Sequence, residues 1–128
     1  MSEHPPESEF QRWTTLDTWQ QADELVQSCQ VVVDRPAGSA HPKVTSFIYP
    51  VDYGYLDGTT GGDGEGIDVW RGELGNRVMA MAWTVDLSKR NSEVKWLLGC
   101  SPREVAAIDA FYATQPQAAL LLFRPDGA

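Results

Sequence analysis

The residues best suited to chemistry lie in an acidic, glycine-rich stretch at positions 61–70, GGDGEGIDVW. It carries Asp63, Glu65 and Asp68, and the chain has no Lys or Arg between Val44 and Trp70. Glycine lets the backbone turn sharply, so neighbouring carboxylates can approach one point. Hard cations such as Mg²⁺ prefer such oxygen ligands. A solvated acidic turn is the alternative, but Asp68 lies in an apolar strand-like segment, where its charge needs a partner. The pattern therefore favours a metal site.

Side chains that could hold an anion flank this stretch. The basic ones on or beside expected strands and turns are Arg35, Lys43, Arg71, Arg77 and Lys95. Lysine contacts phosphate as a point charge and arginine as a fork. Glu93 and Lys95 alternate along an expected strand, so they share one face of it. Taken singly, each cation is typical of a protein surface, and the tyrosines Tyr49, Tyr53 and Tyr55 are typical of core packing.

Length and composition limit the possible functions. The 128 residues predict a single domain spanning 1–128, with 1–12 as a loose arm. A formal charge of −8 argues against a nucleic-acid partner. No apolar run is long enough to span a membrane, and the polar N-terminus does not resemble a signal peptide. We therefore expect a cytoplasmic protein with reduced, buried thiols at Cys29 and Cys100; a disulfide between them is the alternative.

The elements that must position these residues follow from periodicity and turn signals. Helical spacing predicts a helix from about Asp17, as N-cap, to Cys29. Ser101, Pro102 and Glu104 predict the start of a second helix that continues to about residue 114. Strands are expected at 31–33, from 67, at 77–85, 93–98 and 118–123, with mostly loop at 36–66. This order favours a small α+β domain built on an antiparallel sheet or barrel.

Three blocks of the sequence together resemble the soluble, Mg²⁺-dependent inorganic pyrophosphatases of family I. The stretch 63–69, DGEGIDV, resembles that family's D-x-D-x-x-D signature, and 49–55, YPVDYGY, resembles the tyrosine-containing segment before it. Residues 33–43 resemble an early strand in which an acid precedes a proline and a substrate lysine. Asp86 with Glu93-Val-Lys95 resembles the D-x4-D-x-K block. The resemblance covers about residues 31–98.

The resemblance implies a role for each matching residue. It makes Asp63, Asp68, Glu93 and Asp86 metal ligands and makes Glu65 the acid that takes a proton from the attacking water. It makes Lys43, Tyr53 and Lys95 phosphate-binding groups and Asp34 an acid on the pocket wall. It further implies two or more Mg²⁺ ions, with Mn²⁺ as a substitute, pyrophosphate and phosphate as ligands, and a homo-oligomer. The implied fold is a mainly β, α+β domain: a five-stranded, OB-like twisted barrel flanked by an N-terminal and a C-terminal helix.

The chain departs from the family pattern in several places. Glu65 and Glu93 replace aspartates, and Asp86 is two residues too far from Glu93. The hairpin that carries a substrate arginine is missing after Lys43, so Arg35, Arg71 or Arg77 would have to replace that residue. The Tyr-Lys pair near the last helix is absent. Two alternatives to pyrophosphate hydrolysis therefore stay open: a hydrolase of another small phosphoanhydride or nucleotide, and a non-catalytic module that binds phosphate or metal.

Overall fold

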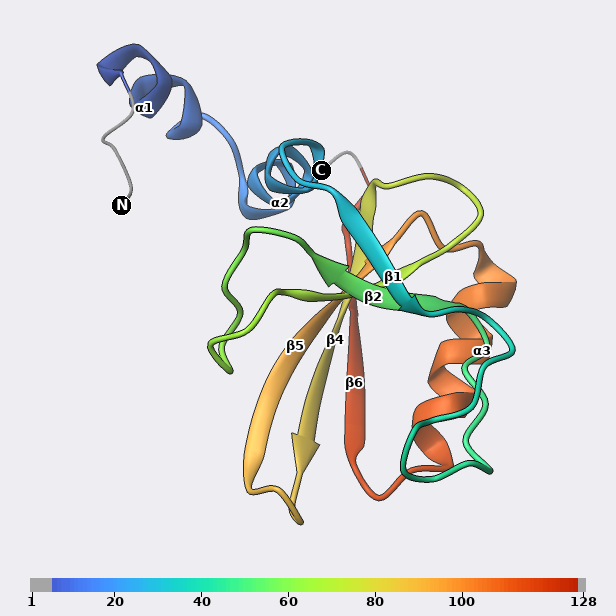
Figure 1. Ribbon diagram of the computed structural model, residues 1–128. Coiled ribbons are helices and arrows are strands. Elements are labelled where there is room, and N and C mark those ends of the chain that lie inside the picture. The colour runs from blue at the N-terminus through green and yellow to red at the C-terminus, as the bar shows by residue number, and fades with distance from the viewer. Residues whose placement is uncertain (1–5, 127–128) are drawn as a thin grey trace.

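The computed structural model describes residues 6–126 and contains three helices and six strands in that range (Figure 1). The helices are α1 (Glu7–Trp13), α2 (Thr18–Gln27) and α3 (Pro102–Ala113). The strands are β1 (Val31–Arg35), β2 (Asp52–Leu56), β3 (Asp68–Arg71), β4 (Val78–Asp86), β5 (Asn91–Leu98) and β6 (Ala118–Phe123). The expected mixed α+β fold, mainly β, is confirmed.

All six strands form one sheet in the order β1-β2-β3-β5-β4-β6. Every neighbouring pair is antiparallel except β3 and β5, which run parallel. The expected five-stranded closed barrel is not confirmed, because within residues 6–126 the sheet has six strands and stays open, with β1 and β6 at its edges. The sixth strand is the apolar segment 118–123, which pairs with β4 along the whole strand.

Both longer helices begin where local capping signals predict. The Asp17 carboxylate accepts a hydrogen bond from the Gln20 N–H, and the Gln20 side chain accepts one from the Asp17 N–H. Ser101 and Glu104 form the same reciprocal pair at the start of α3. Each pair satisfies N–H groups that have no partner inside the helix. These two predictions are confirmed.

The structure adds two elements that the sequence patterns do not predict. Residues 7–13, at the end of the expected loose arm 1–12, form the short helix α1, which buries none of its residues; residues 1–5 of that arm lie outside the described part of the chain. The stretch 36–66 is mostly loop, as expected, but Asp52–Leu56 within it forms β2 between β1 and β3. Gly54 makes the pairing with β1 possible: a Cβ there would lie 1.8 Å from the Val32 carbonyl oxygen.

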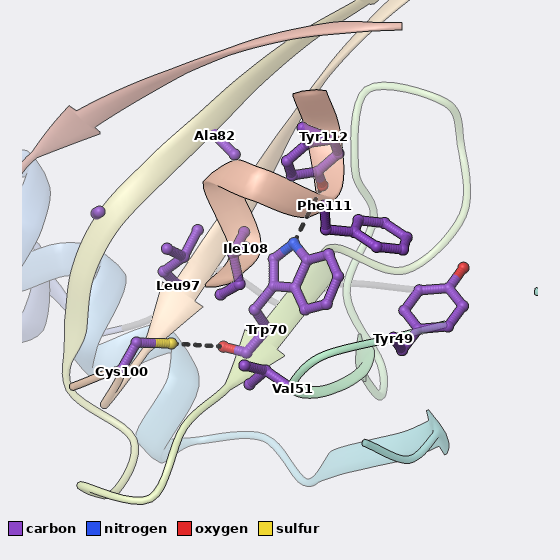
Figure 2. Packing of buried hydrophobic residues seen from close by; sticks show 10 residues of the cluster. Tyr49, Val51, Trp70, Ala82, Leu97, Cys100, Ile108, Phe111 and Tyr112 are labelled. Atoms are coloured by element: carbon purple, nitrogen blue, oxygen red, sulfur yellow. Dashed lines mark hydrogen bonds between the residues drawn. The ribbon is translucent and has the colours of Figure 1, made fainter. Parts of the chain in front are cut away.

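The core lies on both faces of the sheet. Trp70 and Leu97 pack with α3 residues such as Phe111 in one cluster (Figure 2). Their chain neighbours Val69 and Leu98 belong to a second cluster, which includes Ala22 and Val26 of α2. Adjacent residues of a strand point to opposite faces, so α3 and α2 cover opposite sides of the sheet. Buried Trp70 also donates its Nε1–H to the Tyr112 hydroxyl at 3.0 Å.

Several apolar side chains at the β6 edge of the sheet are exposed. Leu120, Leu122 and Phe123 are 53%, 48% and 59% exposed, and Trp83 on the neighbouring strand is 47% exposed. Trp83 lies opposite Leu120 in the β4–β6 pairing and opposite Val94 in the β4–β5 pairing, so a row of apolar side chains crosses three strands. None of the described helices is long and apolar enough to cross a lipid bilayer.

Candidate metal centre and active-site cleft

A polar cleft of about 450 Å³ opens where β1, β2, β3 and β5 meet the end of α3 and the β4–β5 turn. Its acidic lining residues are Asp34, Asp63, Glu65, Asp68, Asp86 and Glu93, and its basic ones are Arg35, Lys89 and Lys95, with His41. Tyrosines and side-chain amides complete the wall. Most of the site residues expected from the sequence therefore share one cleft.

Three of the carboxylates converge on a single point. Asp63 comes from the glycine-rich loop, Asp68 from the first position of β3 and Glu93 from β5. One carboxylate oxygen from each lies within 4.8 Å of the others. Asp68 and Glu93 are partly buried, whereas Asp63 is exposed. We call these three residues the carboxylate trio.

The parallel pairing of β3 with β5 explains how the trio meets Lys95. Val69 pairs with Trp96, so Asp68 and Lys95, one residue earlier on each strand, are neighbours. Lys95 Nζ lies 3.0 Å from Asp68 Oδ2 and 3.3 Å from Glu93 Oε2, and its side chain is almost fully buried. Burial opposes its charge, but the nearby charges, first that of Asp68, outweigh burial and raise the pKa of Lys95. The ammonium group therefore stays charged at neutral pH.

The glycine loop holds Asp63 in place by local hydrogen bonds. The Glu65 N–H donates to Asp63 Oδ1 at 3.0 Å, and this bond is the main reason that the pKa of Asp63 is lowered. Gly64 has a φ of 85°, a left-handed conformation that glycine adopts without strain. The Ile67 N–H donates to Thr59 Oγ1 at 3.0 Å. This bond joins the two ends of the loop immediately before β3 begins.

Tyr53 forms part of the cleft wall between the trio and the core. Its ring lies 5.8 Å from Lys95 Nζ and 4.8 Å, edge to face, from the Trp70 ring. Burial raises the pKa of Tyr53, and the charge of Asp68 raises it further. The phenol therefore keeps its proton and remains a hydrogen-bond donor.

The remaining residues implied by the resemblance are not members of the trio. Glu65 and Asp34 line the cleft as exposed side chains. Asp86 also lines it, but its Oδ1 accepts hydrogen bonds from Ser88 N, Ser88 Oγ and Lys89 N, which fix the β4–β5 turn. Lys43 is exposed and is not one of the residues that line the cleft; its N–H donates to His41 Nδ1 at 3.0 Å.

Several lining residues have no counterpart among the expected ones. The sequence patterns indicate no role for Lys89 or His41, and Arg35 is one of three candidate replacements for the missing arginine. The other two, Arg71 and Arg77, do not line the cleft. The pKa of His41 is lowered, first by burial and then by the charges of Arg35 and Lys89. The sequence does carry a signal for Lys89: this residue lies in the turn that directly follows Asp86, an acid that matches the family pattern.

The donor set of the trio fits a hard divalent cation. All three groups are carboxylates, no thiol or imidazole lies among them, and the cleft leaves room for water and a phosphate oxygen. Asp68 and Glu93 each form an ion pair with Lys95 through one carboxylate oxygen. The three negative groups of the trio therefore have one positive charge, that of Lys95, in ion-pair contact. Two formal negative charges are left for a cation to neutralise.

Comparison with known proteins adds little to this geometry. No protein-family model matches the chain, and no curated protein matches it in sequence. Among solved structures, the chain is similar to an inorganic pyrophosphatase from Coxiella burnetii, with a TM-score of 0.48 and 17% sequence identity over 71% of this chain and 81% of that one. A similarity this weak assigns neither a family nor an activity, so we argue the function from the cleft.

Proposed function

We propose that this protein is a Mg²⁺-dependent hydrolase of inorganic pyrophosphate. The observation that carries the proposal is the trio: three carboxylates from three separate segments lie within 4.8 Å of one another beside the buried ammonium of Lys95. Acidic and basic groups in one cleft suit a ligand that brings both a divalent cation and phosphate oxygens. The sequence resemblance supplies the identity of the phosphate compound.

Asp63, Asp68 and Glu93 would hold the cation. Mg²⁺ bound there would supply positive charge against the phosphate oxygens and would lower the pKa of a water molecule toward neutrality. In the reaction, the water oxygen forms a bond to one phosphorus while the bridging P–O bond breaks, and orthophosphate leaves with the bridging oxygen. Glu65, exposed at the cleft, is the proposed acceptor of the water proton, through a carboxylate oxygen.

Lys95 and Tyr53 are the proposed donors to the phosphoryl oxygens. Lys95 has three N–H donors, and Asp68 and Glu93 engage two of them, which leaves one for a ligand. Tyr53 keeps its proton for the reason given above. Positioning and charge stabilisation dominate phosphoryl transfer, so two fixed donors at the trio suit this chemistry.

Some expectations from the sequence stay predictions. They are a phosphate-binding role for Lys43, a ligand role for Asp86, a wall role for Asp34, more than one bound Mg²⁺, and a homo-oligomeric, cytoplasmic protein. Lys43 would have to reach the ligand from outside the cleft lining, and Asp86 would bind a metal through Oδ2, because its Oδ1 accepts the hydrogen bonds of the β4–β5 turn.

The test is phosphate release from pyrophosphate by the purified protein, first with Mg²⁺ and then with excess EDTA. We expect release that requires Mg²⁺ and that falls by about 100-fold or more in Glu65→Gln, a typical contribution of a general base. Glu73→Gln, an exposed glutamate outside the cleft, is the matched control and should retain full activity. Faster turnover of nucleotides than of pyrophosphate would select the first alternative. Binding of Mg²⁺ and pyrophosphate without turnover would select the binding module.

A further inference from the structure

The sheet face opposite α3 carries two rows of apolar side chains across β4, β5 and β6. Paired residues of neighbouring strands point to the same face, and so do alternate residues of one strand. The pairing gives one row centred on Trp83 and one centred on Met81, which together contain Met81, Trp83, Val94, Trp96, Leu120 and Leu122. We call these six residues the apolar face. The helix α2 packs at one end of it, against Met81 and Trp96, whereas the row of Trp83 is exposed.

The chemistry of the apolar face is that of a buried surface. None of its six positions carries a charged residue, although the chain has 18 Asp and Glu and 10 Lys and Arg. An antiparallel sheet that faces water normally presents polar residues on that side. The Trp83 Nε1–H donates to Ser92 Oγ at 2.8 Å, so the polar atom of the indole is satisfied and its rings offer apolar area. The face therefore suits another apolar protein surface.

A groove of about 600 Å³ continues the apolar face toward the N-terminal helices. Its large apolar lining residues are Met81 and Trp96 of the face, Trp13 of α1, Leu16, and Leu25 of α2. The helix α1 buries none of its residues and is joined to α2 by the ion pair of Arg12 with Glu24. Apolar side chains of both helices and of the sheet thus border one groove that the described chain does not fill.

The two ends of the apolar face carry charges of opposite sign. Figure 1 shows α1 and α2 beyond one end of β4 and β5 and the β4–β5 turn at the other. At the helix end, the first turn of α1 carries Glu7 and Glu9, and Glu9 lines the groove. The β4–β5 turn carries the exposed residues Lys89 and Arg90. Two copies that face each other with antiparallel strands would therefore place the acidic end of each over the basic turn of the other.

We propose that the apolar face is the interface of a two-fold dimer, in which two copies of this chain pack sheet against sheet with antiparallel strands. A two-fold interface is self-complementary, and two uncharged faces let copies that each carry a charge of −8 approach at an apolar surface. Parallel strands would instead bring like charges together at both ends. The proposal names the surface, the symmetry and the contacting ends, which the expected homo-oligomer does not, and it is independent of the carboxylate trio and of the proposed function.

The area available is close to what a stable dimer needs. Four residues of the apolar face and two at its margins are each 37–53% exposed: Trp83, Val94, Leu120 and Leu122, with Leu25 and Val85. At about 180 Å² for a fully exposed large apolar side chain, they present about 500 Å² per copy and about 1,000 Å² in the pair. Stable interfaces begin at about 1,200 Å², and the α1 side of the groove and the charged ends would supply the remainder.

Sedimentation equilibrium of the purified protein tests the dimer over about 1–200 µM, a range that covers micromolar dissociation constants. We expect the wild type to dimerise. Leu120→Glu should weaken the dimer by about 100-fold or more, because it buries one unpaired carboxylate from each copy. Leu74→Glu is the matched control: it places the same charge on an exposed leucine of the β3–β4 connection and should dimerise like the wild type. Circular dichroism checks that both variants stay folded.

A charge exchange tests the antiparallel arrangement. In low salt, Arg90→Glu and Glu9→Arg should each weaken the dimer by about tenfold, because each turns two exposed attractions per dimer into repulsions. The double variant, Glu9→Arg with Arg90→Glu, should recover wild-type affinity. Residues 9 and 90 lie at opposite ends of the apolar face within one chain, so recovery requires contact between copies.

Three results would overturn the proposal. The first is a wild type that stays monomeric throughout the concentration range, including one that instead binds vesicles of phosphatidylcholine through this face. The second is a dimer that Leu120→Glu and Leu74→Glu leave equally strong. The third is a double variant whose dimer is no stronger than those of the single charge variants, because that excludes the antiparallel arrangement.

Discussion

Asp63→Asn should separate the electrostatic role of the carboxylate trio from its structural role. Asparagine has nearly the same shape and keeps an oxygen that can accept the Glu65 N–H, so the glycine loop should stay folded. The substitution removes one of three negative groups whose oxygens lie within 4.8 Å. Two unit charges at that distance repel by about 1 kcal/mol in water and about 3 kcal/mol at an effective dielectric constant of 20. Asp63 is exposed, so we expect the lower figure.

The two states of the protein should therefore respond differently. In EDTA and low salt, Asp63→Asn should unfold within about 1 kcal/mol of the wild type, because the repulsion that is lost is offset by a weaker hydrogen bond from the Glu65 N–H, the bond that lowers the pKa of Asp63. In Mg²⁺ it should be less stable than the wild type. Free Mg²⁺ at about 100 times Kd stabilises a folded protein by about 2.7 kcal/mol, and a tenfold weaker Kd reduces that gain to about 1.4 kcal/mol.

Thermal unfolding followed by circular dichroism measures this difference. An entropy of unfolding of about 2.1 cal/mol/K per residue implies that 1 kcal/mol shifts the Tm of a chain of this length by about 4 °C. Mg²⁺ should then raise the Tm of the wild type by about 10 °C and that of Asp63→Asn by about 5 °C. Asp57→Asn removes an exposed acid outside the cleft and should respond to Mg²⁺ like the wild type. Equal Mg²⁺ shifts in all three proteins would refute the trio as a metal site.

Three further predictions concern the fold. Tyr112→Phe leaves the buried Trp70 N–H without its partner and should cost about 1–3 kcal/mol in the free energy of unfolding, measured with urea; a loss below about 0.5 kcal/mol would contradict the buried bond. Ser101→Ala removes the α3 cap and should cost about 1 kcal/mol in the same assay, and an unchanged stability would argue against that cap. Burial raises the pKa of Cys100 to about 12, and its side chain is inaccessible, so at pH 8 a thiol reagent should modify half-buried Cys29 and reach Cys100 only after denaturation. Rapid labelling of two thiols in the folded protein would be inconsistent with this burial.

The features that could be predicted from the sequence are those set by neighbouring residues. The caps at Asp17 and Ser101 need only four consecutive residues, and both helices start where expected. Successive side chains of a strand point to opposite faces, so Glu93 and Lys95 must share one face of β5. The glycine-rich loop makes an acidic cluster plausible, and the structure brings Asp63 and Asp68 together with Glu93.

The features that could not be predicted depend on pairing between distant segments. The chain order of the strands does not reveal that β3 runs parallel to β5, although that pairing puts Asp68 beside Lys95. The register shift near Arg35 exists only relative to β2. Asp86 matches a ligand pattern in the sequence, and no local pattern shows that its Oδ1 also fixes the turn that follows it. The sheet would close into a barrel only if its edge strands β1 and β6 paired with each other. No local sequence pattern shows whether two such distant segments pair.

The uncovered edge of β6 has a consequence for how the protein behaves at high concentration. Residues 118–123 contain no charge and no proline, the two devices with which many proteins prevent a sheet edge from adding another strand. The exposed leucines and Phe123 give an incoming strand an apolar surface to cover. We therefore expect refolding yield to fall with protein concentration through strand-to-strand aggregation at this edge. The same six residues that complete the sheet thus set an upper limit to the concentration at which the chain can be refolded.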